Sequence, residues 1–395
     1  MEKYPIHVVS TYFLPVQGGL ENNIYQVYTR LAKQGWDVTV HTSNRGPNSK
    51  KTFPKKELMD GIKVRRYNYI VFSLLPFFRL NLFKTSLIVV KDIIIFPGIF
   101  IFSIAYLFKT LGLKRFGLTL SEHGLFSYSP HLYPGLKMRI KRVIDRSVNV
   151  FLINMTVDSI RAVSAKIKQD LIAGGIIENK IRIINNGLDD LAFQDVVGLA
   201  SEPVRALVQN MSPYILQVGR VDRVKNLQAT IRAFQYLAEE IKLIFVGHIA
   251  NKNYRNDLIY LANTLHLEKR VIFAGSFYGA DKYYIMKNAL ACVSSSKNEG
   301  YGLVILEALS QGAICIVNKG TAIEELVADK VNGFVVDFDN AKEVAGSIER
   351  ISQEPNRIVM NEVRSKAIES VQGKTWNKTA AEIEKMYHGI MEAIV

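Results

Sequence analysis

The chain has 395 residues, which is more than one hydrophobic core usually organises, so two domains are expected. Hydrophobic residues make up 48% of it and charged residues 22%, values typical of a globular enzyme, and the absence of internal repeats or low-complexity tracts excludes a repeat architecture. Residues 1–200 hold 27 Lys and Arg against 14 Asp and Glu, and therefore carry nearly all of the net charge of +14. This half is expected to meet an anionic surface or substrate.

Strand-like and helix-like runs alternate along the chain, which is the pattern of βα units that form parallel sheets. In the first half the predicted strands are 6–10, 36–43, 61–67, 92–96, 117–123, 159–164 and 180–187. In the second half they are 214–219, 242–247, 270–275, 289–295, 313–318 and 333–337. We therefore predict an α/β protein with two Rossmann-like domains, residues 1–199 and 200–374, whose parallel sheets face a central cleft. Residues 375–395 form an amphipathic helix that could pack on either domain.

The longest apolar segment, residues 92–108, is too short for a transmembrane helix because its uncharged run is broken by Pro97 and Gly98. A strand at 92–96 followed by a buried helix is the better interpretation. The first residues of the chain have an apolar run too short for a signal peptide, so a cytoplasmic protein is expected.

The stretch NEGYGLVILEAL, residues 298–309, places Glu299 and Glu307 between two apolar strands. A helix that begins near Gly302 and Leu303 would offer free amides to a phosphate at the carboxyl edge of the sheet. Each carboxylate can accept hydrogen bonds from two neighbouring hydroxyls, so the two suit the diols on either side of a diphosphate. That outline of ribose, diphosphate and hexose predicts a nucleotide-sugar site.

The stretch LQVGRVDRVKN, residues 216–226, ends the first predicted strand of the second half at Gly219 and places Arg220 and Lys225 in the loop beyond it. Two cations at the carboxyl end of a strand suit a diphosphate, and they matter most when that group departs. The alternative interpretation is a solvated basic loop.

Two further candidates come from the first half of the sequence. Gly18 and Gly19 join the first strand to the first helix, where they either let a ligand approach the backbone or simply form a tight turn. His123 ends a predicted strand at the same edge, although a lone histidine is usually structural. The acidic triplet at 337–339 imitates a metal-binding motif, but it follows a strand and precedes a helix, so capping is the preferred interpretation and no metal site is expected.

These pieces in this order resemble the retaining glycosyltransferases of family 4, which have the GT-B fold. The resemblance spans nearly the whole chain, through GGLENN, SEHG, IINNGLD, VGRVDRVKN, NEGYGLVILEAL, NGFVVD and a terminal helix that carries Trp376. Two differences from the family pattern stand out: His248 and Ile249 follow Gly247 where the family usually shows a second glycine, and Asn226 replaces a frequent glycine.

The resemblance implies a role for each of the candidate residues. Gly18 and Gly19 would lie near the donor diphosphate, and His123 would approach the donor sugar. Arg220 and Lys225 would stabilise the departing nucleoside diphosphate, Glu299 would hold the sugar hydroxyls, and Glu307 would bind the ribose. Gly219, Gly302 and Leu303 belong to the same donor site, and residues 375–395 would return to the first domain.

The resemblance also implies a metal-independent transfer of a hexose, with retention of configuration, from a UDP- or GDP-sugar to a glycan or lipid-linked acceptor. We expect no cofactor and no nucleic-acid partner. Two alternatives stay open: an epimerase or hydrolase of nucleotide sugars on the same fold, and a basic nucleic-acid-binding protein, against which the lack of any recognised RNA or DNA motif speaks.

Basic and apolar residues alternate at helical spacing in residues 136–146, and aromatic residues lie between basic ones in residues 65–83. Both segments could lie on an anionic leaflet, so we predict a peripheral enzyme of the inner membrane face that takes part in polysaccharide or lipopolysaccharide synthesis. The alternative is that the aromatic side chains are ordinary core and the basic ones solvated.

Overall fold

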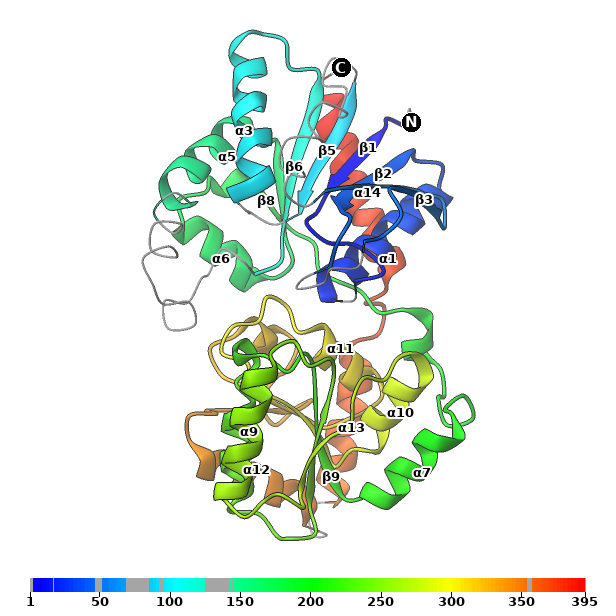
Figure 1. The fold of residues 1–395 in the computed structure, drawn as a ribbon, viewed down its shortest axis with the longest axis vertical. Coiled ribbons are helices and arrows are strands. Elements are labelled where there is room, and N and C mark those ends of the chain that lie inside the picture. The colour runs from blue at the N-terminus through cyan, green and yellow to red at the C-terminus, as the bar shows by residue number, and fades with distance from the viewer. Residues whose placement is uncertain are drawn as a thin grey trace. The chain divides into compact units, whose positions relative to one another are not determined.

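The computed structural model describes residues 3–16, 18–46, 52–68, 85–91, 95–124, 143, 145–353 and 357–394. The chain forms two compact units. The first combines Met1–Gly187 with Trp376–Val395, and the second is Leu188–Thr375. Each has its own sheet with helices on both faces, in agreement with the predicted pair of Rossmann-like domains (Figure 1).

The predicted boundary after residue 199 lies too far along the chain, because the residues that follow Gly187 pack into the second unit. A short 3-10 helix, η3 (Asp190–Phe193), begins this segment. The Ala192 carbonyl accepts a hydrogen bond from Gln311 Nε2 at 2.8 Å, and Asp189 Oδ1 accepts one from the Tyr283 hydroxyl at 3.1 Å. These contacts make the segment part of the second unit.

The first sheet has the strand order β3-β4-β2-β1-β5-β6-β7-β8, and every pair in it is parallel except β3 with β4. Its strands are β1 (Ile6–Val9), β2 (Val38–Ser43), β3 (Lys56–Met59), β4 (Ile62–Tyr67), β5 (Ser86–Lys91), β6 (Phe116–Glu122), β7 (Ser159–Ala162) and β8 (Ile181–Ile183). The central strands β2, β5 and β6 are buried along their whole length, as expected for parallel strands covered on both faces.

The helices of the first unit are α1 (Gly19–Lys33), α3 (Ile95–Thr110), α5 (Val150–Thr156), α6 (Ala165–Ala173) and α14 (Trp376–Glu392), with the short helices η1 (Asp145–Asn149) and η2 (Glu178–Lys180). Helix α3 packs against α5 on one face of the sheet, and α1 packs against α14 on the other (Figure 1). The terminal helix therefore returns to the first unit, held there by the buried Trp376 and by a 2.7 Å hydrogen bond between the Tyr28 and Tyr387 hydroxyls.

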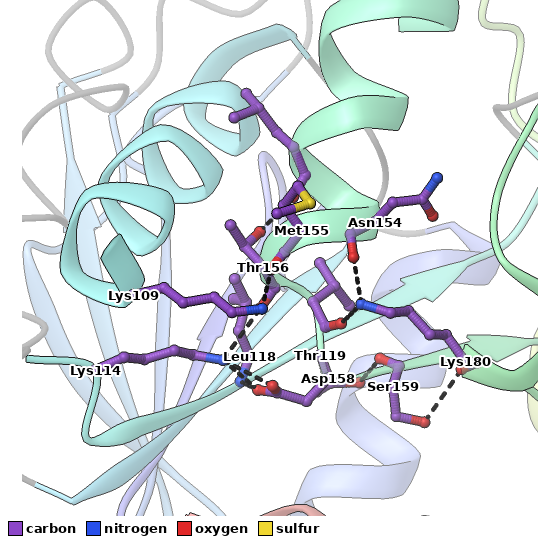
Figure 2. A network of polar contacts seen from close by, with 12 residues as sticks. Lys109, Lys114, Leu118, Thr119, Asn154, Met155, Thr156, Asp158, Ser159 and Lys180 are labelled. Atoms are coloured by element: carbon purple, nitrogen blue, oxygen red, sulfur yellow. Dashed lines mark hydrogen bonds and ion pairs between the residues drawn. The ribbon is translucent and has the colours of Figure 1, made fainter. Parts of the chain in front are cut away.

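Three lysines hold the carboxyl end of α5 (Figure 2). Lys109 donates to the Met155 carbonyl at 2.7 Å, Lys114 to the Thr156 carbonyl at 3.1 Å, and Lys180 to the Asn154 carbonyl at 2.6 Å. Cations here satisfy carbonyls that have no partner within the helix and oppose its dipole. Part of the positive charge of the first unit is thus structural and lies at the amino edge of the sheet, where β6 and β7 begin.

The second sheet has the order β11-β10-β9-β12-β13-β14, and all of its pairs are parallel. Its strands are β9 (Tyr214–Val218), β10 (Lys242–Val246), β11 (Val271–Phe273), β12 (Ala291–Ser294), β13 (Cys315–Asn318) and β14 (Phe334–Val336). Its helices are α7 (Glu202–Met211), α8 (Leu227–Phe234), α9 (Lys252–Thr264), α10 (Gly279–Asn288), α11 (Leu303–Ser310), α12 (Ala341–Ser352) and α13 (Arg357–Ser370), with the short helices η4 (Arg223–Lys225) and η5 (Ala322–Glu325). All six strands predicted in this half are confirmed.

The expected strand at 92–96 is wrong. The strand in this part of the chain is β5, at Ser86–Lys91, and Ile95 already belongs to helix α3. The continuous apolar run hid the transition, because periodicity alone does not separate a buried strand from a buried helix. Within the part of the chain that the structure describes, no helix is long and apolar enough to cross a membrane.

The segments proposed to lie on a membrane fall largely outside the described residues. This holds for most of 136–146 and for 69–83 within the aromatic segment. Tyr67, which belongs to that segment and is described, is buried, and its hydroxyl lies 2.8 Å from His41 Nδ1. It therefore packs in the core and does not act as an anchor.

Candidate functional site

The order of strands in the second sheet reverses between β9 and β12, which pair directly with each other. Ligands of open α/β sheets bind beyond the carboxyl ends of the strands at such a switch point. The loop after β9 carries Gly219, Arg220 and Lys225, and the loop after β12 carries Glu299. The structure therefore brings these predicted residues to the position where a ligand site is expected.

The loop after β9 turns sharply at Gly219, which has a φ of 147° and donates its amide to the Val246 carbonyl at 2.8 Å. A side chain there would meet the Lys225 stem, with a Cβ atom 3.6 Å from Lys225 Cε. Lys225 ends the short helix η4, and Asn226 follows it with a left-handed φ of 52°. Asparagine adopts this conformation more readily than other residues with a side chain, so it can replace the glycine that is frequent here.

Lys225 and Glu299 form an ion pair, with 2.5 Å between Lys225 Nζ and Glu299 Oε2. Both side chains are shielded, with exposed fractions of 23% and 21%, so the pair is screened less than a surface salt bridge. Arg220, in the same loop as Lys225, is exposed, and its guanidinium forms no hydrogen bond or ion pair with any residue that the structure describes. An anion at this edge would meet one cation that already has a partner and one that does not.

A buried polar network holds the two loops together. Ser295, just after β12, donates to the Lys225 carbonyl at 2.9 Å and accepts from Gln217 Nε2 at 2.8 Å. Asn226 Nδ2 donates to the Ser295 carbonyl at 3.1 Å. The sequence analysis missed Ser295 and Gln217, because a serine after a strand and a glutamine within one carry no distinctive spacing. Their contacts fix the backbone from which Lys225 and Glu299 extend.

Helix α11 begins at this edge, with Gly302 as its N-cap. Gly302 has a φ of 90°, and a Cβ atom there would lie 2.8 Å from Ile323 Cγ1, so the position requires glycine. The first amides with an acceptor inside the helix are those of Ile305 and Leu306, which both donate to the Gly302 carbonyl. The amides of Leu303 and Val304 thus have no acceptor within the helix and are available to an anion.

Glu307 lies further along α11 and is also paired with a lysine. Lys282 Nζ, on helix α10, is 2.7 Å from Glu307 Oε1, and the two side chains are 21% and 13% exposed. The sequence analysis predicted Glu307 but not Lys282, since one lysine on an otherwise mixed helix gives no signal before the neighbouring helix is known.

The residues that depart from the glycine pattern after β10 have a structural role. The Val221 amide donates to the His248 carbonyl at 2.9 Å, and Val221 and Ile249 form a parallel bridge. Gly247 itself is tightly packed, because a Cβ atom there would be 2.0 Å from the Gly219 carbonyl oxygen. The loops after β9 and β10 therefore support each other through their backbones.

The predicted residues of the first unit lie at the carboxyl edge of its own sheet, Gly18 and Gly19 at the start of α1 and His123 just after β6. Gly18 is the N-cap of α1 in an extended conformation, and Gly19 has no atom within 4 Å of the position of a Cβ. The space at Gly19 is compatible with close approach of a ligand, whereas a Cβ atom on Gly18 would meet the Glu21 carboxylate at 2.3 Å. Neither glycine has the positive φ that would make it necessary for the turn alone.

His123 follows β6, with its Nε2 atom 3.1 Å from the Ser121 hydroxyl oxygen. Loss of hydration on burial, with the cations Lys91 and Arg161 nearby, holds the pKa of His123 well below its usual range. The imidazole is therefore neutral at neutral pH and can accept or donate one hydrogen bond without carrying charge.

A buried polar cluster, which the sequence analysis also missed, lies behind His123. Asn23 on α1 donates to Asn186 Oδ1 at 2.7 Å and accepts from Lys91 Nζ at 3.2 Å. Arg161 donates to the same Asn186 oxygen at 2.8 Å. The cluster ties the start of α1 to strands β5 and β7 and to the residues after β8. Its members come from four separate stretches of sequence, so only the fold reveals them.

The acidic triplet at 337–339 forms ion pairs with lysines, Asp337 with Lys319 at 2.9 Å and Asp339 with Lys297 at 2.6 Å. The cap of helix α12 is the next residue, Asn340, whose side chain accepts from the Glu343 amide at 3.3 Å. No group of three or more His, Cys, Asp or Glu side chains suited to a metal ion occurs among the described residues.

Models of known protein families match both halves of the chain. Residues 17–190 match the model described as Glycosyltransferase Family 4, and residues 202–372 match Glycosyl transferases group 1. The chain is 27% identical over 224 residues to an uncharacterised glycosyltransferase of Methanocaldococcus jannaschii, which covers 54% of this chain and 55% of the relative.

A second relative has a named substrate. The chain is 29% identical over 209 residues to the N-acetylgalactosamine-N,N'-diacetylbacillosaminyl-diphospho-undecaprenol 4-alpha-N-acetylgalactosaminyltransferase of Campylobacter jejuni, a match that covers 51% of this chain and 54% of that enzyme. The chain thus spans about half the length of these curated relatives.

The structure is similar over its whole length to HepE from Anabaena, solved in complex with UDP and glucose. The TM-score is 0.76 at 18% sequence identity, over 98% of this chain and 99% of that one. Two parallel-sheet α/β units of this kind define the GT-B fold. The chain belongs to the family 4 glycosyltransferases.

Proposed function

We propose that the protein transfers a hexose from a nucleoside-diphosphate sugar to a lipid-linked glycan, with retention of configuration and without a metal ion. The observation that carries the proposal is the pair of shielded Lys–Glu contacts, Lys225 with Glu299 and Lys282 with Glu307, in the unit that holds the N-terminus of α11. Carboxylates accept from sugar and ribose diols, whereas lysine and free amides bind a diphosphate.

The roles follow from the chemistry of each group. Negative charge that develops on the departing diphosphate is met by Arg220, Lys225 and the amides at Gly302 and Leu303, so the step is stabilised electrostatically. Glu299 holds the hydroxyls of the donor sugar, and Glu307 holds the ribose. In the first unit, the neutral His123 is proposed as a hydrogen-bonding group for a sugar hydroxyl and Gly19 as a point of close approach, whereas the Glu21 carboxylate fills the space beside Gly18.

The working mechanism is a front-face substitution. The acceptor hydroxyl forms the new bond to the anomeric carbon on the side from which the diphosphate leaves, and the departing phosphate oxygen takes the acceptor proton. No described carboxylate is assigned as a nucleophile, because both glutamates are given to hydroxyl binding. Atoms balance without a metal or redox partner: the products are the glycoside and the nucleoside diphosphate.

The donor and acceptor classes are supported by similarity. HepE was solved with UDP, so UDP-sugars are the first donors to try, with GDP-sugars beside them. The C. jejuni relative is named for a diphospho-undecaprenol acceptor, which supports a polyprenyl-diphosphate glycan in polysaccharide or lipopolysaccharide synthesis. The positive charge of residues 1–200 supports peripheral contact with the anionic inner face of the membrane.

The test is a reaction of the full chain with UDP- and GDP-hexoses and a polyprenyl-diphosphate glycan, in the presence and absence of EDTA. Proton NMR of the product should show the anomeric configuration of the donor, and EDTA should leave the rate unchanged. Loss of activity in EDTA that manganese restores would contradict the metal-free mechanism, and an inverted product would contradict retention.

Two controls separate the alternative functions. An epimerase or hydrolase would convert the donor completely when no acceptor is added, whereas a transferase should not. Co-sedimentation with vesicles tests the membrane: the chain should bind anionic vesicles at low salt and ignore zwitterionic ones. A protein that instead binds duplex nucleic acid at physiological ionic strength would favour the nucleic-acid alternative.

A further inference from the structure

Lys282 and Glu307 form the less exposed of the two shielded Lys–Glu ion pairs described in the second unit; a third described pair, Lys366 with Glu369, is exposed. Lys282 Nζ lies 2.7 Å from Glu307 Oε1, and only 13% of the glutamate side chain is exposed. Lys282 donates to Oε1, and no residue that the structure describes donates to Oε2. One carboxylate oxygen is thus engaged by the protein while the other keeps its acceptor capacity.

A second contact, with the ring of Tyr283, holds Lys282 in place. Its ammonium lies 5.0 Å from the centre of the Tyr283 ring, and the Tyr283 hydroxyl donates to Asp189 Oδ1 at 3.1 Å. Burial, followed by the nearby charges of Glu307 and Asp189, raises the pKa of Tyr283, so the phenol stays protonated and neutral. Lys282 therefore provides the positive charge beside Glu307, and the neutral Tyr283 provides the hydrogen bond to Asp189.

A second lysine on the same helix provides a contrast. Lys287 also ends 2.8 Å from a carboxylate, that of Asp195, but these side chains are 38% and 73% exposed. An exposed pair is weakened by solvent and by the entropy of two long side chains, whereas a shielded pair holds its geometry more strongly. The two lysines have the same chemistry and lie on the same element, so Lys287 is a matched control for Lys282.

We propose that Lys282 is a positioning residue of the donor site, which fixes Oε1 of Glu307 so that Oε2 is presented to the ribose hydroxyls of the nucleotide. This inference rests on the proposed role of Glu307 in ribose binding. Its consequence is specificity: the site prefers ribonucleotides to 2′-deoxyribonucleotides, because a missing hydroxyl leaves a shielded acceptor without its donor.

The experiment measures binding of UDP and 2′-deoxy-UDP by calorimetry, with GDP and 2′-deoxy-GDP in parallel. Wild type should bind the ribonucleotide about tenfold more tightly or better, the scale of one hydrogen bond to a charged group. In Lys282→Met this ratio should fall by about threefold or more, within the usual range for coupled neighbours. Lys282→Arg should keep most of the preference, and Lys287→Met should keep all of it.

Each outcome separates the alternatives. An unchanged ratio of the two affinities in a folded Lys282→Met variant overturns the inference. If the variant loses affinity equally for the ribonucleotide and the 2′-deoxyribonucleotide, the ammonium acts on a phosphate or base and not through Glu307. In a Glu307→Gln background, the further change Lys282→Met should alter the ratio no more, so an additional loss also contradicts the proposal. If wild type binds none of the four nucleotides, the donor site itself is wrong, and the proposed function falls with it.

Discussion

The Nζ atom of Lys225 lies 2.5 Å from Oε2 of Glu299, and this contact joins the loops that follow the neighbouring strands β9 and β12. The pair occupies the switch point of the sheet, where a ligand would bind. A donor diphosphate would compete with Glu299 for the ammonium. Binding of donor would therefore release a carboxylate for the sugar hydroxyls and transfer a lysine to the phosphate in one exchange of partners.

Replacement of Lys225 by alanine should lower the turnover number by about 10² or more, because a preorganised charge that stabilises the leaving diphosphate is lost. Arg220→Ala should have a similar effect. Single-turnover kinetics with saturating donor measures the chemical step directly. The matched control is Arg223→Ala, since Arg223 lies on the same short helix but pairs at 2.6 Å with the exposed Asp257. A comparable loss in the control would point to disruption of the loop and not to lost charge.

Alanine substitutions of Glu299 and Glu307 should have different effects on transfer and on nucleotide binding. Glu299→Ala should abolish transfer while the free nucleoside diphosphate still binds, because the proposed partner of this carboxylate is the sugar. Glu307→Ala should weaken the free nucleotide itself, by roughly tenfold or more if a hydrogen bond to a charged group is lost. Calorimetry with UDP and GDP on both variants distinguishes these outcomes. Equal losses of nucleotide affinity would rule out the division of labour.

Much of the second unit could be predicted from the sequence, because short apolar runs followed by glycine mark parallel strands and their carboxyl ends. Glu299, Gly302 and Glu307 could be placed relative to one another since they lie within one loop and one helix. Lys282, Ser295 and the cluster around Arg161 could not, since their partners come from distant stretches and their own spacing is ordinary. The strand at Ser86–Lys91 was missed because an apolar run of this length fits a buried strand or a buried helix equally well.

Two glycines of the second unit should respond to alanine in opposite directions. In Gly247→Ala, the new methyl group would collide with the Gly219 carbonyl at a φ of 149°, so the free energy of unfolding should fall by about 2 kcal/mol or more. Gly346 lies exposed within α12, with no atom within 4 Å of a Cβ, so Gly346→Ala should raise it by about 0.5–1 kcal/mol. Scanning calorimetry should show both shifts in the transition of the second unit, and a tolerated Gly247→Ala would contradict the tight packing of the two loops.

The stability of the first unit should depend on pH through His7. Its Nδ1 atom lies 3.2 Å from His41 Nε2, and burial, opposed by Asp37 and assisted by Arg65 and Lys63, lowers the pKa of His7 to about 4. Between about pH 6.5 and pH 4 the unfolded chain binds a proton that the native state lacks. The free energy of unfolding should therefore decrease as the pH falls through this window, by about 1.4 kcal/mol per pH unit, while above it this histidine contributes no slope.

The measurement can be confined to the first unit, since both tryptophans of the chain, Trp36 and Trp376, are buried there. Urea unfolding followed by tryptophan fluorescence between pH 7.5 and 4.5 gives the slope for this unit alone. His7→Gln removes the titrating group but keeps polar atoms near His41. The free energy of unfolding of this variant should therefore depend on pH less steeply than that of wild type, by the equivalent of about one proton. His123, which is also held neutral, should supply a residual slope of the same sign. If wild type and His7→Gln lost stability in parallel below pH 6.5, the native state would be binding a proton at His7, and the assignment of a neutral His7 would be wrong.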